Sequence, residues 1–195
     1  EVTVSMTEKQ RGIYEAYLNE ARKLAREKKG VSVFAALTRL RQICVDPSSF
    51  LENYTETPAK LEVALDKVTD SIEGGHRVLV FSSFTKVLEH FRYLLDALDI
   101  RSYYISGETP GDLRVEMADK FNREDRIKVM LVSVKAGGTG LNLIGADTVI
   151  HLDPWWNVAA EDQASDRTHR IGQTRNVEVI KFIAADSVEQ RVVEL

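Results

Sequence analysis

The sequence predicts an α/β fold with a mainly parallel sheet and helices on both faces. From residue 60 onward, short apolar segments alternate with longer segments whose apolar residues recur every three or four positions. The short segments, such as residues 78–81, are hydrophobic without interruption, which is typical of strands buried on both faces. Successive strands are separated by helix-length connections, and such connections favour parallel neighbours.

The strands and helices of this α/β region can be placed in order along the chain. Strands are expected at residues 78–81, 102–105, 127–132, 148–152 and 177–183, where β-branched and aromatic residues gather. Helices are expected at residues 60–73, 87–98 and 113–121, and a last one opens at residue 186. In sheets of this kind ligands bind at the carboxyl ends of the strands, so we expect the functional residues there.

Residues 1–58 are predicted to form a small helical region and a linker. One helix is expected over residues 7–29, where Gly30 ends it, and a second runs to Asp46-Pro47. Residues 47–58 are rich in proline and small polar residues, as linkers are. We therefore expect two parts, with the helical region and linker in 1–58 and the α/β domain in 59–195.

Composition sets limits on the class of protein. The chain has 195 residues, 44% of them hydrophobic, and a net charge of −4, so one domain with a sizeable core and an appendage is expected. Seven basic residues stand against two acidic ones in residues 20–41. That stretch either contacts DNA phosphates or is a solvated helix face. Cys44 is the single cysteine and the four histidines lack ligand spacing, so neither a disulfide nor a metal site is predicted.

The location of the protein is also an expectation from the sequence. No long apolar run and no signal-peptide pattern is present, so we expect an intracellular protein that does not bind a membrane. It would lie in the cytoplasm or nucleoid of a bacterium or archaeon, or in the nucleus of a eukaryote. Because the sequence starts at Glu1 and stops within a predicted helix, we expect a piece of a longer protein.

Residues 161–173 carry the most specific chemical pattern. They are predicted to form a helix that ends at Gly172. On that helix Gln163, Arg167 and Arg170 would share one face, because they stand at positions i, i+4 and i+7. Two guanidiniums so arranged suit a polyphosphate, and the pair could act as arginine fingers. A solvated helix with ion pairs explains the local pattern equally well.

A second pattern is glycine-rich. Residues 133–143 follow the third predicted strand, and three of the four residues 137–140 are glycines. Glycines let a ligand approach the backbone closely and leave amides free to point at phosphate oxygens. Lys135 adds a positive charge to the segment. Taken alone, the cluster is also compatible with a flexible turn.

Together these segments resemble a known family. Residues 166–173, Asp-Arg-Thr-His-Arg-Ile-Gly-Gln, resemble the last helicase motif of the Swi/Snf-type DNA translocases in helicase superfamily two, and residues 133–143 resemble motif V. Residues 40–47 are similar to the helical protrusion before the second motor lobe of that family. The resemblance implies a RecA-like (P-loop NTPase-type) fold. It also implies arginine fingers at Arg167 and Arg170, and a nucleotide near Gly138 and Gly140, with Gln163 on the same site.

The same resemblance implies a set of DNA-binding residues. Ser133 and Lys135 would meet phosphates of the tracked strand. Residues 80–85 are similar to motif IV of the family, in which Ser83 and Thr85 would hold a DNA phosphate. These two residues could also be plain helix caps. Tandem tryptophans after a strand are usually core residues, but the resemblance places Trp156 toward the DNA groove.

Two motor elements are missing from the sequence. It contains neither a Gly-x-x-x-x-Gly-Lys-Ser/Thr phosphate loop nor an acidic box after a strand. The resembling family carries both on its first lobe. We therefore expect the second motor lobe of an ATP-dependent, chromatin-remodelling-type double-stranded DNA translocase, inactive alone. ATP and Mg²⁺ would be held mainly by an N-terminal RecA-like lobe of the same polypeptide.

Two other functions remain as alternatives. One is a non-catalytic module that binds DNA or protein through the basic helices. The other, a strand-separating or RNA helicase, is disfavoured by the Arg-Ile-Gly-Gln ending.

Overall fold

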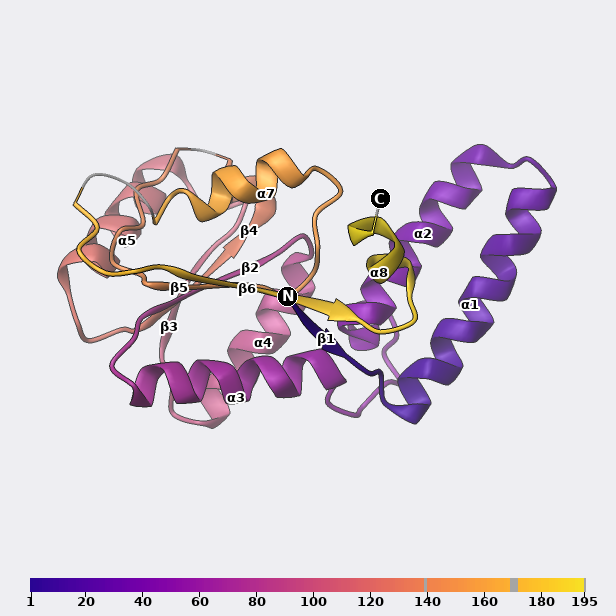
Figure 1. Ribbon diagram of the computed structural model, residues 1–195, viewed down its shortest axis with the longest axis horizontal. Helices are drawn as coiled ribbons and strands as arrows, with labels where there is room; N and C mark the ends of the chain where they lie inside the picture. Colours follow the sequence, from indigo (N-terminus) through magenta and orange to yellow (C-terminus); the bar gives the residue numbers. More distant parts are fainter. Residues whose placement is uncertain (139, 169–171, 195) are drawn as a thin grey trace.

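A six-stranded sheet forms the centre of the computed structural model, which describes residues 1–138, 140–168 and 172–194 (Figure 1). The strands are β1 (Val2–Val4), β2 (Val78–Ser82), β3 (Ser102–Ile105), β4 (Val129–Ser133), β5 (Thr148–His151) and β6 (Glu178–Ala184). Their order across the sheet is β1-β6-β5-β2-β4-β3, and every pairing between them is parallel. The predicted α/β fold class is confirmed.

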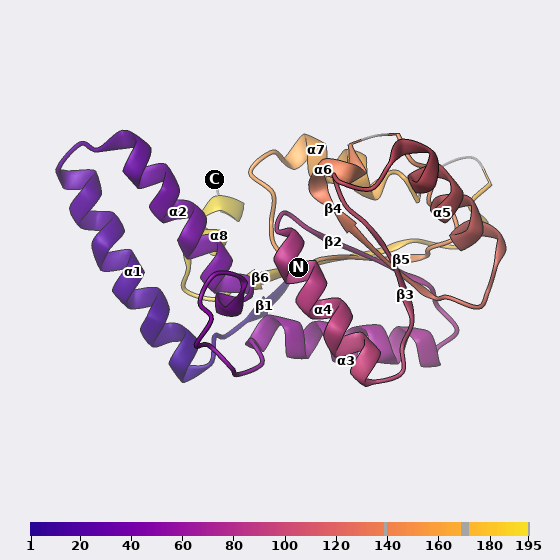
Figure 2. The same cartoon turned by 180° about the vertical axis from the view of Figure 1, so that it is seen from behind.

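Helices cover both faces of the sheet (Figures 1 and 2). Helices α3 (Ala59–Glu73) and α4 (Thr85–Ala97) pack on one face, and α5 (Gly111–Arg123), α6 (Val134–Gly137) and α7 (Val158–Ser165) contribute to the other. Side chains along a strand point alternately to the two faces. In β2, Val78 and Val80 therefore belong to the core under α3 and α4, whereas Leu79 and Phe81 belong to the opposite core.

Two further helices project from one end of the sheet (Figure 1). Helices α1 (Glu8–Arg26) and α2 (Gly30–Val45) pack together and are followed by a short 3-10 helix (Pro47–Ser49). A third small core, with Tyr14, Leu40 and Ile43, joins them to the end of β6, and α8 (Val188–Val193) lies against α2. No helix in the described part of the chain is both long and apolar enough to cross a membrane.

Strand β1 is a feature that the sequence prediction missed. Three residues are too few to show a strand period, and the pairing with β6 brings together residues 180 positions apart, Val2 with Phe182 and Val4 with Ala184. The first residues of the chain therefore belong to the sheet and not to the helical projection. The domain boundary between residues 58 and 59 stays a prediction.

A buried ion pair connects three parts of the fold. Lys60 on α3 and Glu189 on α8 contact each other, and each side chain is 1% exposed. The Lys60 ammonium also donates to the carbonyl of Leu152 (2.9 Å), and the Glu189 carboxylate accepts from the amide of Ala184 (2.8 Å). Burial raises the pKa of Glu189, while the Lys60 charge opposes that rise. The pair ties α8 to the segment that follows β5.

Removal of one partner should be costly. We expect Lys60→Met to lower the free energy of unfolding by about 3–5 kcal/mol, because it leaves a buried carboxylate without its counter-charge. Urea denaturation measures the change. Lys67→Met is the matched control: its partner Glu178 is 60% exposed, so that loss should stay below about 1 kcal/mol. Equal losses in the two variants would contradict the assigned role of the buried pair.

Candidate functional site

Four predicted DNA-binding residues line one groove of about 590 Å³ at the carboxyl ends of β2, β3 and β4. Ser83 and Thr85 come from the β2–α4 junction, and Ser133 and Lys135 come from the β4–α6 junction. The other lining residues are Gln42, Phe84, Lys86, Glu89, Tyr104, Ser106, Gly107 and Glu108. The wall thus carries hydroxyls and two lysines together with two carboxylates. The sequence prediction placed these residues in separate motifs, and the sheet brings them together.

A buried aspartate organises the β2–α4 junction. Asp153, which is 0% exposed, accepts from the hydroxyl of Ser82 (2.6 Å) and from the amide of Ser83 (3.0 Å). The Ser82 hydroxyl in turn accepts from the amide of Phe84 (3.1 Å). The cap position of α4 is Phe84, and Thr85 is the first helical residue. The alternative reading of Ser83 and Thr85 as helix caps is therefore wrong, because Ser82 provides the local side-chain bond.

The β4–α6 junction is built on tight packing. The Ser133 hydroxyl accepts from the amide of Ala136 (3.3 Å), which starts the short helix α6. A Cβ on Gly137 would lie 3.1 Å from a ring carbon of Phe81, so glycine lets the backbone approach the ring. Lys135 is exposed on this helix, and its ammonium is available to the groove.

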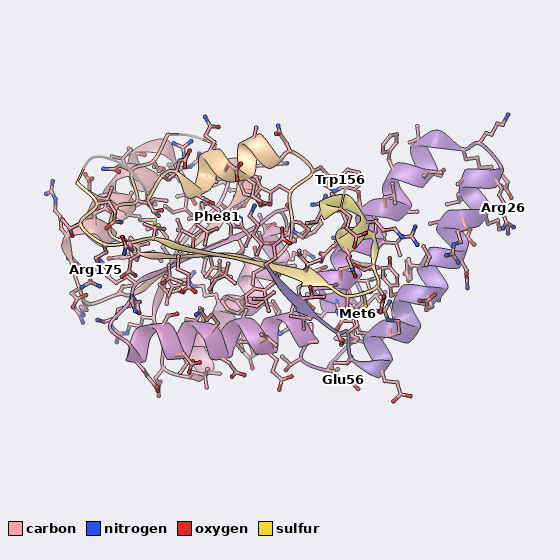
Figure 3. All side chains as sticks on the ribbon, in the orientation of Figure 1. Met6, Arg26, Glu56, Phe81, Trp156 and Arg175 are labelled. Atoms are coloured by element: carbon pink, nitrogen blue, oxygen red, sulfur yellow. The ribbon has the colours of Figure 1, made fainter. Side chains whose placement is uncertain are left out.

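The two tryptophans have different environments. Trp155 is 7% exposed and packs edge-on against Phe81, whereas Trp156 is 51% exposed. The Arg41 guanidinium lies 5.4 Å from the centres of the Trp156 and Phe84 rings. Figure 3 shows Trp156 at the end of the sheet that faces the projecting helices. The exposed ring therefore borders the junction between the sheet and α2.

Arg41 is a site residue that motif reasoning missed. Its guanidinium lies 3.6 Å from the carboxylate of Asp153 and donates to the Ser83 hydroxyl (3.4 Å) and to the carbonyl of Pro154 (3.3 Å). The available signal was its place in the basic stretch of residues 20–41. The resemblance of residues 40–47 to the family's helical protrusion included Arg41 but gave it no role at the sheet.

The predicted helix over residues 161–172 is wrong for residues 166–168, and residues 169–171 lie outside the described part of the chain. Helix α7 ends at Ser165, and residues 166–168 form turns in which Arg167 donates to Ala164 and Thr168 donates to Ser165. The carbonyl of Arg167 accepts from the amide of Leu143 (3.2 Å), a partner outside the helix. Gln163 and Arg167 therefore do not lie on one continuous helix.

Arg167 nevertheless lies beside the glycine-rich segment. A Cβ built on Gly140 would be 3.8 Å from Nη1 of Arg167, whose side chain is largely buried. Gly138 and Gly140 are exposed, and Gln163 is exposed on α7. Arg170 lies outside the described residues. The structure thus places Arg167 and Gly140 together, on the sheet face covered by α5, α6 and α7.

His151 at the end of β5 is a buried titratable residue that the prediction also missed. Its ring stacks on Phe81 (5.3 Å between centroids), and Nε2 pairs with the Ser165 hydroxyl (3.0 Å). Burial, helped by the nearby Lys181 charge, lowers the pKa of His151 to about 4. The imidazole is therefore neutral at physiological pH, and its ring packs between Phe81 and the Ser165 hydroxyl at the end of α7.

The six-stranded parallel sheet with helices on both faces has the fold of the RecA-like C-terminal lobes of Snf2 ATPases. Residues 59–172 match the family described as helicase conserved C-terminal domain. The chain belongs to this family, as the C-terminal lobe of a Swi/Snf-type helicase of superfamily two.

Relatives and solved structures give the same result. The chain is 35% identical over 173 residues to an ATP-dependent helicase of Mycoplasma pneumoniae, covering 89% of this chain and 17% of the relative. It is 41% identical over 133 residues to the helicase swr1 of Schizosaccharomyces pombe, covering 68% of this chain and 10% of that helicase. The Sulfolobus solfataricus SWI2/SNF2 ATPase core in complex with dsDNA superposes with a TM-score of 0.86 at 28% identity, covering 100% of this chain and 42% of that one. The chain therefore spans less than a fifth of the length of the Mycoplasma pneumoniae and Schizosaccharomyces pombe helicases.

The low pKa of His151 predicts a pH-dependent stability. The unfolded histidine titrates near 6.5 and the folded one near 4, so the unfolded state binds more protons between these values. Stability from this group is complete above pH 6.5 and falls by up to about 3 kcal/mol as pH drops toward 4. Urea denaturation of wild type and His151→Phe at several pH values isolates the contribution. Parallel pH curves for the two proteins would contradict it.

Proposed function

We propose that this chain is the second motor lobe of an ATP-dependent double-stranded DNA translocase. The observation that carries the proposal is the placement of the Arg167 guanidinium beside Gly140. In this proposal Arg167, with Arg170, completes a nucleotide site whose other half belongs to an N-terminal RecA-like lobe. Two relatives of this chain are ATP-dependent helicases, which supports this activity for the longer protein.

The described residues fit one side of a nucleotide site. Exposed glycines at 138 and 140 leave room for a phosphate chain against the backbone, and the Arg167 fork supplies positive charge next to them. ATP with Mg²⁺, held mainly by the first lobe, supplies the phosphoryl group and the metal. Arg167 stabilises the charge that develops on the transferred phosphoryl group, and Gln163 lies on the neighbouring helix α7. Closure of the two lobes brings the arginine into place.

The groove forms part of the DNA track in this proposal. Lys135 supplies a point charge for a phosphate, and Ser83 and Ser133 supply hydroxyls on the same wall. Trp156, exposed next to Arg41, gives an apolar contact at the edge of the track. A solved relative at 28% identity is described as a complex with dsDNA, which supports a duplex as the partner.

Loss of the arginine should separate hydrolysis from DNA binding. In the longer two-lobe protein, Arg167→Ala is expected to lower DNA-stimulated ATP turnover by about 10³-fold, because the arginine acts on the transition state. DNA affinity should stay within about threefold of wild type, since the arginine lies away from the groove. Arg170→Ala should behave alike. The isolated chain should have negligible turnover, and motor-like turnover by it alone would refute the two-lobe site.

Loss of the groove lysine should change the salt dependence of DNA binding. We expect Lys135→Ala to weaken binding of different DNA sequences uniformly and to reduce the slope of log K against log salt by about 0.9, the value for one phosphate contact. Fluorescence anisotropy over a salt series measures both quantities. The control is Lys120→Ala on α5, whose ammonium pairs with Glu116 outside the groove. Equal slopes in all three proteins would remove Lys135 from the track.

A further inference from the structure

The side chain of Gln173 connects the two segments that carry Arg167 and the glycine-rich loop. Its amide nitrogen donates to the carbonyls of Ile144 (3.0 Å), Ala146 (2.8 Å) and Thr168 (3.1 Å). Its amide oxygen accepts from the backbone of Arg175 (3.0 Å). We infer that Gln173 is a positioning residue for the nucleotide site: it holds Arg167 against the glycine-rich loop. This inference rests on the proposed function of Arg167.

The bonds of Gln173 lie on both sides of Arg167. Thr168 is the next residue after the arginine, and its carbonyl faces the Gln173 amide. The carbonyl of Arg167 itself accepts from the amide of Leu143, one residue before Ile144. Arg167 is therefore joined to residues 143–146 by a direct backbone bond and by the Gln173 bridge. Because these residues continue the glycine-rich loop, the arginine and Gly140 are held in one unit.

Gly172 lets the chain fold back so that Gln173 can reach these carbonyls. Its φ of +107° lies in a region that side chains of L-residues rarely adopt. A Cβ at this position would also lie 3.1 Å from Cδ1 of Ile144. The Gly172-Gln173 pair at the end of the motif in residues 166–173 thus has a physical explanation. The glycine permits the backbone turn, and the glutamine side chain holds the two segments together by its hydrogen bonds.

Glutamine suits this role because one amide both donates and accepts. The nitrogen donates to the carbonyls of three residues, and the oxygen accepts from a fourth backbone group, the amide of Arg175. A methionine has similar length and no N–H, so all three carbonyls would lose this donor. A glutamate keeps the acceptor and places a negative charge against the same carbonyls. These two substitutions remove the same bridge in different ways.

A positioning role has a distinct kinetic signature. A misplaced finger loses interactions made in the transition state, so turnover falls while the KM for ATP and the DNA affinity change little. A residue that only stabilises the fold would lower the melting temperature and weaken DNA binding as well. A displacement of about 1 Å in a catalytic group can cost about 10²-fold in rate. The effect on turnover should therefore be measurable without loss of the fold.

The test compares Gln173→Met with Gln190→Met in the longer two-lobe protein. Gln190 is a matched control on α8, where its amide bonds Glu194 and Asp186 far from this loop. Gln173→Met is expected to lower maximal ATP turnover by about 10²-fold. The KM for ATP and the DNA Kd should stay within about threefold of wild type, because neither depends on the transition state. Gln190→Met should match wild type, and Gln173→Glu repeats the test if the methionine variant does not fold.

A double variant separates this inference from the proposed function. With Arg167→Ala present, Gln173→Met should cause no further loss, because Gln173 acts through the arginine. Independent, multiplicative losses would overturn the inference, as would wild-type turnover in Gln173→Met, or DNA affinity and melting temperature that fall together with turnover. If Arg167→Ala alone keeps its turnover, the proposed finger fails; if only Gln173→Met keeps it, the positioning role alone fails.

Discussion

The parallel register of the central strands is the constraint on which the groove depends. Ser82 in β2 pairs with Ser133 in β4, so the segments that leave these two strands start side by side. Ile105 in β3 pairs with Val132, which brings the start of the third groove wall to the same level. A slip of one residue would turn every side chain of a strand to the opposite face and would destroy both cores. The buried apolar residues of β2 and β4 therefore determine where the groove hydroxyls lie.

The proposed nucleotide site depends on a different kind of contact. Residues 140–147 return from the carboxyl end of β4 to the start of β5, and Leu141, Leu143 and Ala146 bury their side chains in the core under α5 and α7 on the way. The backbone bond between Leu143 and Arg167 forms on top of that buried segment. The position of the arginine is thus set by a loop anchored in the core, while the groove hydroxyls are set by the strand ends.

The sequence predicted what local patterns encode. Continuous apolar strands and helical spacing identified five strands and the helices on both faces, and the family resemblance implied the groove residues Ser83, Thr85, Ser133 and Lys135. Long-range bonds decided the rest. Helix α7 ends at Ser165, and the carbonyl of Arg167 accepts a hydrogen bond from the amide of Leu143 instead of a bond within the helix. The local sequence does not indicate this end of the helix.

Other features were missed for the same reason. Strand β1 forms because Val2–Val4 pairs with the edge of β6, which lies near the other end of the sequence. In sequence Arg41 resembles the other cations of the basic stretch, but only the fold places it against the Asp153 carboxylate and the Ser83 hydroxyl. Local pattern alone could not separate the two tryptophans, and only the resemblance singled out Trp156, because burial of Trp155 depends on Phe81 of β2 and His151 of β5.

The short connection between β4 and β5 gives the proposed motor a physical route for coupling. Ser133 and Lys135 lie in the groove, and Gly140, only five residues after Lys135, lies beside Arg167. Gly137, which lies between them in the sequence, packs against the ring of Phe81. In the proposed motor, a movement of Arg167 on lobe closure would act on residues that follow the proposed DNA groove in the chain. Gln173 and Leu143 bind the arginine segment to residues 143–146 of this connection, so the same connection carries contacts of both proposed sites.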